Sequence, residues 1–288
     1  MSPVSSLPHP ITGAGFPSPV PPGRGWPEDP ARPRTRRARD AEQAAALAAS
    51  TRDLGQLDAR SSVCAACPRL IDWRQEVAAT RRRSYADQPY WGRPVPGLGD
   101  DRPQLLVVGL APAAHGANRT GRLFTGDRSG DWIIAALHRA GYANQPTSDH
   151  AGDGLVLTGA RIVAAVRCAP PDNAPTPAER ATCGHWLRRE IELLSGSITS
   201  ILALGQIAWQ ATFTTLSALG WQVPRPRPTF GHGATGHVVP PTRGATATKP
   251  PIAVVGSYHV SQQNTFTGRL TETMLDEAIS ACAAPERQ

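Results

Sequence analysis

The sequence predicts an α/β fold, a three-layer α/β/α sandwich around a central parallel sheet. Two observations support this prediction. Apolar runs rich in β-branched residues recur along the chain, at residues 105–108, 155–157 with 162–166, 198–204 and 252–255. These runs are continuously apolar, and helical stretches separate them, at residues 131–140, 177–194 and 206–216. Strands that are buried on both faces and joined through helices form parallel sheets covered by helices on both sides.

Residues 41–288 are predicted to form a single domain, and residues 1–40 a disordered arm. The arm is rich in Pro and Arg and has no apolar periodicity, so it offers too little apolar surface for a core of its own. Alanines recur with Leu47 at helical spacing in residues 41–59, which predicts a helical extension of the domain. Residues 220–251 are rich in Pro, Gly and Thr and indicate an irregular excursion before the last strand.

The chain is basic, with a formal net charge of +7 at pH 7. This charge favours a polyanionic partner. The alternative is a basic arm without a partner, because five arginines lie within residues 32–39. No apolar segment follows the first methionine, and no run approaches the ~18 apolar residues of a membrane span. We therefore expect a cytoplasmic protein that does not contact membranes.

Four of the five cysteines are spaced like metal ligands. Cys64 and Cys67 form a CxxC turn followed by a proline, Cys168 follows an apolar run, and Cys183 lies on the predicted helix 177–194. Without an export signal, cysteines favour metal or thiol chemistry over disulfides. Ligation by cysteine alone is expected for an iron-sulfur cluster or a structural zinc ion, and buried free cysteines remain the alternative. Cys282 lies outside this set.

Polar segments follow three of the predicted strands, at residues 109–127, 167–175 and 257–268. Open α/β sheets bind ligands at the carboxyl edge of their strands, so we expect the three segments to share one pocket. The second segment ends at Thr176, which forms a capping box with Glu179 at the start of the next helix.

The first of these segments is a long glycine-containing loop between a strand and a helix, an arrangement suited to binding an anion or a base. It has neither the Gly-Lys-Ser/Thr of a phosphate-binding loop nor the GxGxxG of a dinucleotide-binding turn. In the other segments, prolines stiffen the loop that presents Asn173, whose amide suits the edge of a pyrimidine. The alternative for Asn173 is an Asx turn ahead of Thr176. His259 directly follows an apolar strand and could stabilise a developing anion; the alternative is a structural histidine.

Together these segments resemble the uracil-DNA glycosylase superfamily. Gly109-Leu110-Ala111-Pro112-Ala113 resembles the first motif of its family 5 (B-type) iron-sulfur branch. Residues 120–124 resemble the TGRPF element of the family, in which the aromatic ring, here Phe124, stacks on the base. His259 and Asn264 match the HxSxxN pattern of the last motif. The resemblance covers residues 64–268 and implies a glycosylase-like fold.

The same resemblance implies a cofactor and roles for individual residues. The cysteine order matches that of the iron-sulfur glycosylases, which implies a 4Fe-4S cluster on Cys64, Cys67, Cys168 and Cys183. His259 would donate to the uracil carbonyl, and the loop after it would enter the DNA helix. The residues expected to act in catalysis are Asn173, His259 and Asp127. Those expected to bind the substrate are Gly109, Ala111, Phe124, Asn118 and Asn264.

One departure from other branches concerns the attacking water. Those branches place an Asp or Glu near the start of the first motif, where this chain has Leu110 and Ala111. Such a site would rest more on stabilising the sugar cation and the leaving base than on a strong general base. The polar candidates for holding water are His115, Asn118, Asp127 and Asn173. We expect Asn173 to matter more than Asp127, because Asp127 is also placed to cap the helix after Ser129.

These expectations combine into one functional prediction. The chain is predicted to be a monomeric, monofunctional base-excision-repair glycosylase, cytoplasmic and nucleoid-associated. It would remove uracil, and hypoxanthine or xanthine as well, from double- and single-stranded DNA. The alternative is a non-catalytic iron-sulfur DNA-binding module. A family 4-like enzyme is a second alternative, against which Leu110 argues.

Overall fold

The computed structural model describes residues 6–241 and 250–283. Within them, six strands form one sheet in the order β3-β5-β4-β6-β8-β7. The four central strands run parallel, namely β5 (Ala160–Ala164), β4 (Leu105–Gly109), β6 (Ser200–Leu204) and β8 (Ile252–Ser257). The edge strands β3 (Leu98–Gly99) and β7 (Thr235–Val238) are antiparallel. The predicted parallel sheet is therefore confirmed for the centre, and the edges make the sheet mixed.

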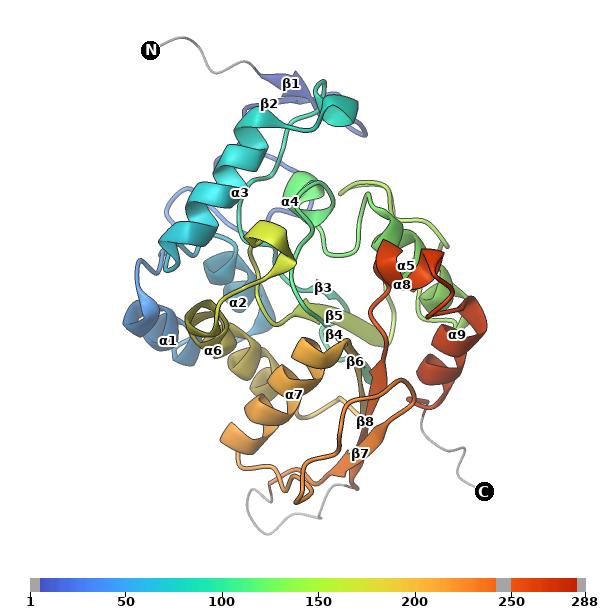
Figure 1. Cartoon of the computed structure of the whole chain (residues 1–288). Helices are drawn as coiled ribbons and strands as arrows, with labels where there is room; N and C mark the ends of the chain where they lie inside the picture. Colours follow the sequence, from blue (N-terminus) through green and yellow to red (C-terminus); the bar gives the residue numbers. More distant parts are fainter. Residues whose placement is uncertain (1–5, 242–249, 284–288) are drawn as a thin grey trace.

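Helices cover both faces of this sheet (Figure 1). Alternate residues of each central strand face opposite layers: Val107 packs in one apolar cluster and Val108 in the other. This two-sided burial explains why the strands are continuously apolar in sequence. One face carries α5 (Arg128–Arg139) and α9 (Glu272–Ser280). The other carries α1 (Ala41–Ala49), α2 (Leu54–Ser61), α6 (Pro177–Leu194) and α7 (Gln206–Ala218).

The remaining helices and 3-10 turns lie mostly above the carboxyl edge of the parallel strands (Figure 1). They are α3 (Pro68–Thr80), α4 (Ala117–Thr120), α8 (Gln262–Phe266) and the 3-10 turns Arg83–Tyr85 and Pro171–Asn173. No helix in the described ranges has both the length and the apolar character that crossing a bilayer requires.

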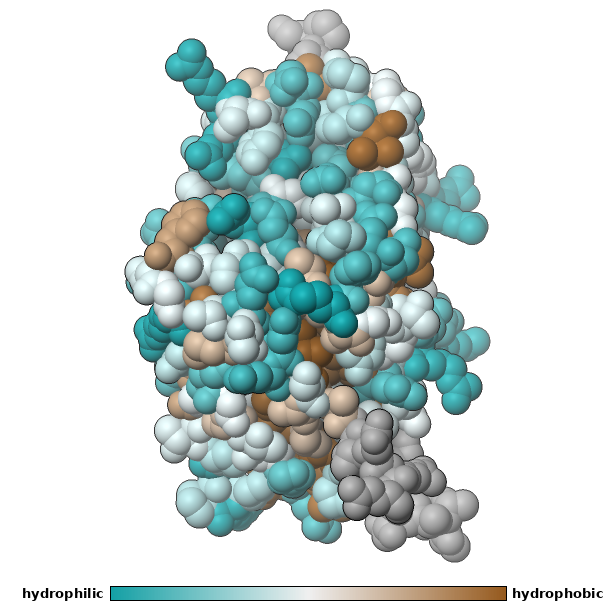
Figure 2. Space-filling view, turned by 90° about the vertical axis from the view of Figure 1, so that its right-hand side faces the viewer, coloured by the Kyte–Doolittle hydropathy of each residue, from teal (hydrophilic) through white to brown (hydrophobic). Residues whose placement is uncertain are grey.

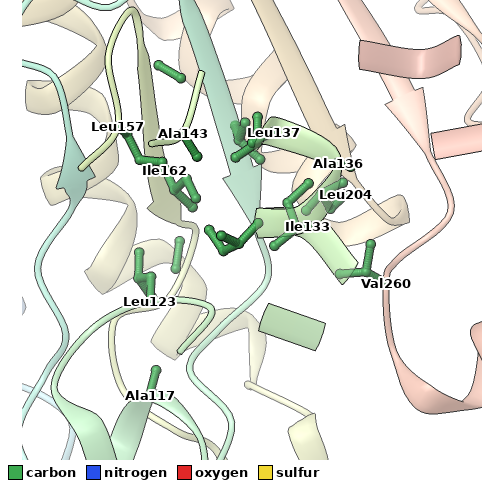
Figure 3. Close-up of a cluster of buried hydrophobic side chains, with 14 of the residues drawn as sticks. Ala117, Leu123, Ile133, Ala136, Leu137, Ala143, Leu157, Ile162, Leu204 and Val260 are labelled. Carbon is green, nitrogen blue, oxygen red and sulfur yellow. The ribbon is translucent and has the colours of Figure 1, made fainter. Parts of the chain in front are cut away.

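The first polar loop is anchored in the core between α5 and the sheet. Ala117 and Leu123, both within this loop, belong to the same buried cluster as Ile133 of α5 and Ile162 of β5 (Figure 3). Val260, within the third polar segment, belongs to this cluster too. Two of the loops that the sequence assigns to the site are therefore fixed by apolar packing below them.

Three predicted elements differ in their extent. Residues 155–157 form no strand, and Leu157 makes only an isolated bridge with Ala143. The helix predicted for residues 41–59 breaks into α1 and α2, because Asp53 caps a new helix start by accepting the Gln56 N–H. The helix predicted from residue 131 begins at Arg128, one residue after its cap.

The predicted disordered arm is wrong for residues 6–40, and residues 1–5 lie outside the described part. Strands β1 (Leu7–Pro8) and β2 (Gly15–Phe16) pair with each other. Trp26 is 3% exposed, and its Nε1 donates to the Thr120 carbonyl at 3.1 Å. The arm lacks periodicity because its buried residues are isolated anchors on an irregular path, not one face of a helix or strand. Composition alone therefore predicted disorder, although the arm packs against the domain.

The face that carries α5, α8 and α9 is largely hydrophilic (Figure 2). Apolar residues show there only in a narrow central strip and at a few separate points. The large apolar side chains that are exposed in the described ranges are Ile11, Val156 and Phe266. Phe266, 66% exposed at the end of α8, is the one that belongs to the third polar segment.

Candidate active site

The three polar segments lie above one edge of the sheet, as predicted. They follow β4, β5 and β8. Strands β4 and β5 pair directly, and β6 lies between β4 and β8 in the parallel part of the sheet. The first contains α4, the second contains the turn Pro171–Asn173, and the third contains α8 (Figure 1).

An aromatic ring and an imidazole meet above this edge. The rings of Phe124 and His259 are 6.4 Å apart between centroids, with an interplanar angle of 35°. A Cβ on Gly109 would lie 3.1 Å from the Phe124 ring, and a Cβ on Gly205 would lie 3.4 Å from the Cβ of His259. Glycines at the ends of β4 and β6 therefore let both rings lie close to the strand ends. Phe124 has φ 49°, in the left-handed region, a strain typical of functional loops.

Two buried arginines shape the loop that carries Phe124. Arg119 donates from Nε to the His115 carbonyl and from Nη2 to the Gly126 carbonyl, both at 2.8 Å. Arg122, 3% exposed, donates from Nη2 to Asp153 at 2.6 Å and from Nη1 to Glu28 of the arm at 3.1 Å. Both guanidiniums therefore tie the first loop to itself and to its surroundings.

Asp127 lies at the end of the first loop and caps α5. Its Oδ1 accepts the Gly130 N–H at 3.0 Å. A Cβ on Gly116 would come within 1.8 Å of Oδ2, so the second oxygen faces the backbone of the same loop. Burial raises the pKa of Asp127, while backbone N–H donors from Gly130 and Ser129 oppose that shift. The capping role expected for this residue is confirmed.

Asn173 lies at the exposed tip of the second segment. Its φ is 55°, and that of Asp172 is 54°, so the loop turns through two left-handed residues. Within the described residues its side-chain amide has no hydrogen bond, and Thr176 caps the following helix together with Glu179. The alternative of an Asx turn is therefore not observed, and the amide of Asn173 is free to meet a ligand.

His259 lies in a largely apolar environment. Burial lowers its pKa to about 4, so the imidazole is neutral at pH 7 and can donate one N–H. Asn264 donates from Nδ2 to the His259 backbone carbonyl at 2.8 Å. The backbone carbonyl of Asn264 accepts the Leu270 N–H at 3.0 Å. These bonds give Asn264 a positioning role in the third loop, whereas its contact with substrate stays a prediction.

Asn118 is fully buried below the first loop. Its Nδ2 donates to the carbonyls of Arg74 at 3.2 Å and Ala114 at 3.4 Å, while its Oδ1 has no hydrogen-bond partner among the described residues. These bonds give Asn118 a structural role, and its contact with the substrate or its water stays a prediction. Ala111 is half-buried in the loop after β4, and its predicted contact with substrate is not tested by any bond observed here.

His115 faces the region of α3 and Tyr90. The Tyr90 hydroxyl lies 3.1 Å from His115 Nδ1 and 3.4 Å from the Arg82 amide nitrogen, which donates to it. Burial lowers the pKa of His115, and Arg82 and Arg119 lower it further. A neutral His115 is thus fixed by Tyr90 at the rim of the first loop.

The sequence reading missed the residues that fix the loops. Arg119 and Arg122 are three apart in a segment whose glycines and aromatic residue drew attention instead. A pair of arginines in an otherwise small-residue loop was the signal that could have found them, because buried arginines need carbonyl or carboxylate partners. Gly116 and Gly205 carry no pattern that separates them from ordinary turn glycines.

The four predicted cysteines line one cavity. Cys64 precedes α3, Cys67 is its N-cap residue, Cys168 follows β5 and Cys183 lies on α6. The other walls of this cavity are mostly apolar. Cys282, by contrast, is a buried member of the core beside α9. The fold thus brings the four cysteines, which are far apart in sequence, to one cavity.

Four thiols in one cavity fit the ligand set of an iron-sulfur cluster. In the described ranges, no three His, Cys, Asp or Glu side chains group closely enough for one metal ion. A cluster spreads its ligands, because each thiolate binds a different iron. Burial, followed by the neighbouring Cys64 and Glu179, raises the pKa of Cys67 to about 11. Burial also raises the pKa of Cys168 to about 12.

Hydrogen-bond donors surround these thiols. The Arg167 backbone N–H donates to Cys183 Sγ at 3.2 Å. Trp186 interacts with Cys64 through its side chain and lowers the pKa of that thiol. Arg74 lies close enough to Cys64, Cys67 and Cys168 to lower their pKa values. Arg74 Nε and Arg167 Nε are buried without hydrogen-bond partners among the described residues. Donors and cations beside four thiols fit an anionic thiolate-ligated cluster.

Comparison with known proteins agrees with this arrangement. The family model described as the uracil DNA glycosylase superfamily matches residues 96–283. A type-5 uracil-DNA glycosylase of Mycobacterium tuberculosis is 56% identical over 269 residues, 93% of this chain and 95% of the relative. One from Thermus thermophilus is 45% identical over 76% of this chain and 91% of the relative. A type-4 uracil-DNA glycosylase of Thermotoga maritima is 32% identical over only 40% of this chain.

The two type-5 relatives match 93% and 76% of the chain, and the type-4 relative matches less than half of it. The resemblance to family 5 and the preference against family 4 are both confirmed. The chain therefore belongs to the uracil DNA glycosylase superfamily and, within it, to the type-5 uracil-DNA glycosylases.

Proposed function

We propose that this chain is a DNA-repair glycosylase that excises uracil by hydrolysing the N-glycosidic bond and leaves an abasic site. The pairing of Phe124 with a neutral His259 carries the proposal, in a chain whose relatives are named uracil-DNA glycosylases. Enzymes that act on a base take it out of the DNA stack. An extruded pyrimidine stacks on Phe124 and brings its carbonyl edge to His259.

The residues act on the two charges that develop as the bond breaks. The base leaves with the electron pair of the glycosidic bond, and the His259 N–H stabilises the negative charge on its carbonyl oxygen. Water adds to the sugar carbon, and its proton passes to the departing base or to solvent. The carboxylate of Asp127 caps the helix at the end of the loop that carries Phe124. Asn173, at the tip of its proline-rich turn, would contact the base edge.

The substrate range follows from the residues after β4. Leu110 and Ala111 supply neither a carboxylate nor a large polar group there. A pocket without that group discriminates less between bases, because it leaves no buried polar group unpaired when another base enters. Supported by this composition, the proposal extends to hypoxanthine and xanthine.

The DNA interface extends from the third loop. Phe266 protrudes at the end of α8, and the Arg128 guanidinium lies 5.2 Å from its ring. An exposed aromatic residue beside an arginine suits the gap that an extruded nucleotide leaves in the stack. Double- and single-stranded DNA both offer the phosphates and the base. We expect the protein to act as a monomer in the cytoplasm, associated with the nucleoid.

A 4Fe-4S cluster is the cofactor we propose. Cys64, Cys67, Cys168 and Cys183 would hold it, because they line one cavity together with Arg167 and Trp186. When bound, the cluster would cross-link α3, α6 and the strand end of β5, and thereby stabilise the fold. A structural zinc ion is the alternative occupant.

The proposed activity predicts release of free uracil from a uracil-containing duplex and alkali-labile sites in the product. His259→Ala should slow single-turnover excision roughly 10²- to 10³-fold, the scale for losing one preorganised donor. His237→Ala, at an exposed position on β7, is the matched control and should keep the wild-type rate. Wild-type protein that binds the duplex but releases no base would instead make the chain a non-catalytic DNA-binding module.

Two further variants assign the water-holding group. Asn173→Ala should slow excision on the order of 10²-fold, because it removes a fixed polar contact with the reacting base. Asp127→Asn keeps an N-cap residue and removes only the charge, and we expect it to cost about tenfold or less, about 1.4 kcal/mol. The reverse order, with cluster content and thermal unfolding unchanged, would make Asp127 the group that holds water.

The lowered pKa of His259 predicts a particular pH dependence. Plotted against pH, kcat/KM should show no His259 inflection at the ordinary value of 6.5 and should fall only near pH 4. Between those values the unfolded chain binds a proton at this residue and the folded chain does not. The free energy of unfolding should therefore decrease as pH falls from 6.5 toward 4, and His259→Gln should lessen that decrease. An inflection near pH 6.5 that disappears in His259→Gln would contradict the account.

The proposed cluster predicts brown protein with broad visible absorption and about four irons and four sulfides per chain. Cys168→Ser should bleach the protein and lower its thermal stability, because Cys168 is one of four ligands in an apolar cavity. Cys282→Ser is the control, since it changes a buried thiol outside the cavity and should leave colour and iron content unchanged. Colourless, zinc-containing wild-type protein with full activity would rule the cluster out.

A further inference from the structure

The arm presents a row of arginines to solvent. Residues 32–39 contain five of them, Arg32, Arg34, Arg36, Arg37 and Arg39, and all five are exposed. The alanines that flank and interrupt the row, Ala31 and Ala38, are 3% and 0% exposed. The arm therefore buries its small residues against the domain and directs every cationic side chain outward.

The backbone of this row is fixed. Arg32 and Thr35 form a turn in which the Thr35 N–H donates to the Arg32 carbonyl at 2.9 Å. The Ala65 N–H donates to the Ala38 carbonyl at 2.7 Å, next to the cysteine cavity. Before the row, Asp29 pairs with the buried Arg93 at 2.7 Å. The arginines cannot move apart to relieve their mutual repulsion except by side-chain rotation.

Two arginines of the helical extension add to the same positive surface. Arg60 of α2 lies near Arg36 and Arg52: burial lowers the pKa of Arg60, and these two cations lower it further, while Asp53 partly compensates. Repulsion among exposed guanidiniums costs folding free energy, although solvent and salt screen it. We define the arm surface as the five arginines of the row together with Arg52 and Arg60.

This arm surface is left without acidic partners. Arg93, Arg122, Arg161 and Arg167, which are buried, each form an ion pair with an Asp or Glu. Among the described residues, none of the arm-surface arginines has a carboxylate within 4.0 Å. These four buried arginines are thus neutralised, whereas the arm surface stays positive without carboxylate partners.

The chemistry of this surface favours phosphates. Lys249 is the only lysine of the chain, so its basic character rests on arginine. A guanidinium binds phosphate through two parallel N–H donors and sheds its hydration more readily than an ammonium group. Ahead of the arginine row, the arm contacts the first loop, because Trp26 donates to the Thr120 carbonyl. From there it passes behind α3 to α1 (Figure 1).

We propose that the arm surface is a second DNA-binding site, which holds phosphates of duplex DNA outside the base pocket without reading sequence. This proposal rests on the proposed function only in taking DNA as the substrate. Arginines at this surface would lengthen the contact with undamaged DNA and would not take part in bond cleavage. Neutralising phosphates releases counterions, so the contact has a measurable salt dependence.

The test compares full-length wild type with the triple variant Arg34→Gln/Arg36→Gln/Arg37→Gln on an undamaged duplex. The matched control, Arg102→Gln/Arg188→Gln/Arg225→Gln, removes three other exposed arginines. Affinity is measured over a series of salt concentrations. The arm variant should bind about tenfold more weakly at low salt, and the slope of log K against log salt should become shallower by about 0.9 for each phosphate lost. Single-turnover excision at saturating enzyme should remain at the wild-type rate.

Two results would overturn the proposal. In one, the arm variant keeps the wild-type slope and affinity, which would leave an acidic protein as the partner to examine. In the other, the control loses as much as the arm variant, which would reduce the effect to net charge. Thermal unfolding and visible absorption confirm that each variant is folded. Failure of the glycosylase proposal is separate, because it appears as absence of uracil release by wild type whatever the salt slopes show.

Discussion

Two buried guanidiniums hold the loop on which the proposed chemistry depends. Arg122 makes ion pairs with Asp153 and with Glu28, and Arg119 ties the His115 and Gly126 carbonyls together. Burying a cation is expensive unless its donors are satisfied, and breaking a buried pair commonly costs about 3–5 kcal/mol. The loop thus has one favourable shape, in which Phe124 lies against Gly109 despite its left-handed backbone.

The same constraint joins parts of the chain that are far apart in sequence. Glu28 belongs to the arm, so the arm that binds Arg122 also supports the base pocket. On the opposite side, Arg161 and Arg167 lie between Asp58 and Glu190, in a buried network that links β5, α2 and α6. Arg167 directly precedes Cys168 and donates to Cys183. Buried arginines therefore fix both the cysteine cavity, after β5, and the loop of Phe124, after β4.

The sequence predicted what periodicity, spacing and family motifs encode. Continuous apolar runs predicted the parallel strands, and the Thr176 capping box predicted the start of α6. The order of the cysteines among the motifs predicted that the four would meet at one site. It did not predict the arm, because Phe16 and Trp26 are isolated anchors without a period. It also did not separate the asparagines, because the side chains of Asn118 and Asn173 look alike in sequence. One is bonded to buried carbonyls and the other is exposed on a stiff loop.

Buried arginine contacts hold the first loop ready for an extruded base. Amide hydrogen exchange across residues 115–126 in Arg119→Met, together with the single-turnover rate of this variant on uracil-containing DNA, tests this constraint. Met keeps most of the side-chain volume and removes the donors to His115 and Gly126. We expect faster exchange confined to this loop and excision slower on the order of 10²-fold, the cost of a misplaced reacting group. Wild-type exchange and wild-type rate in this variant would contradict it.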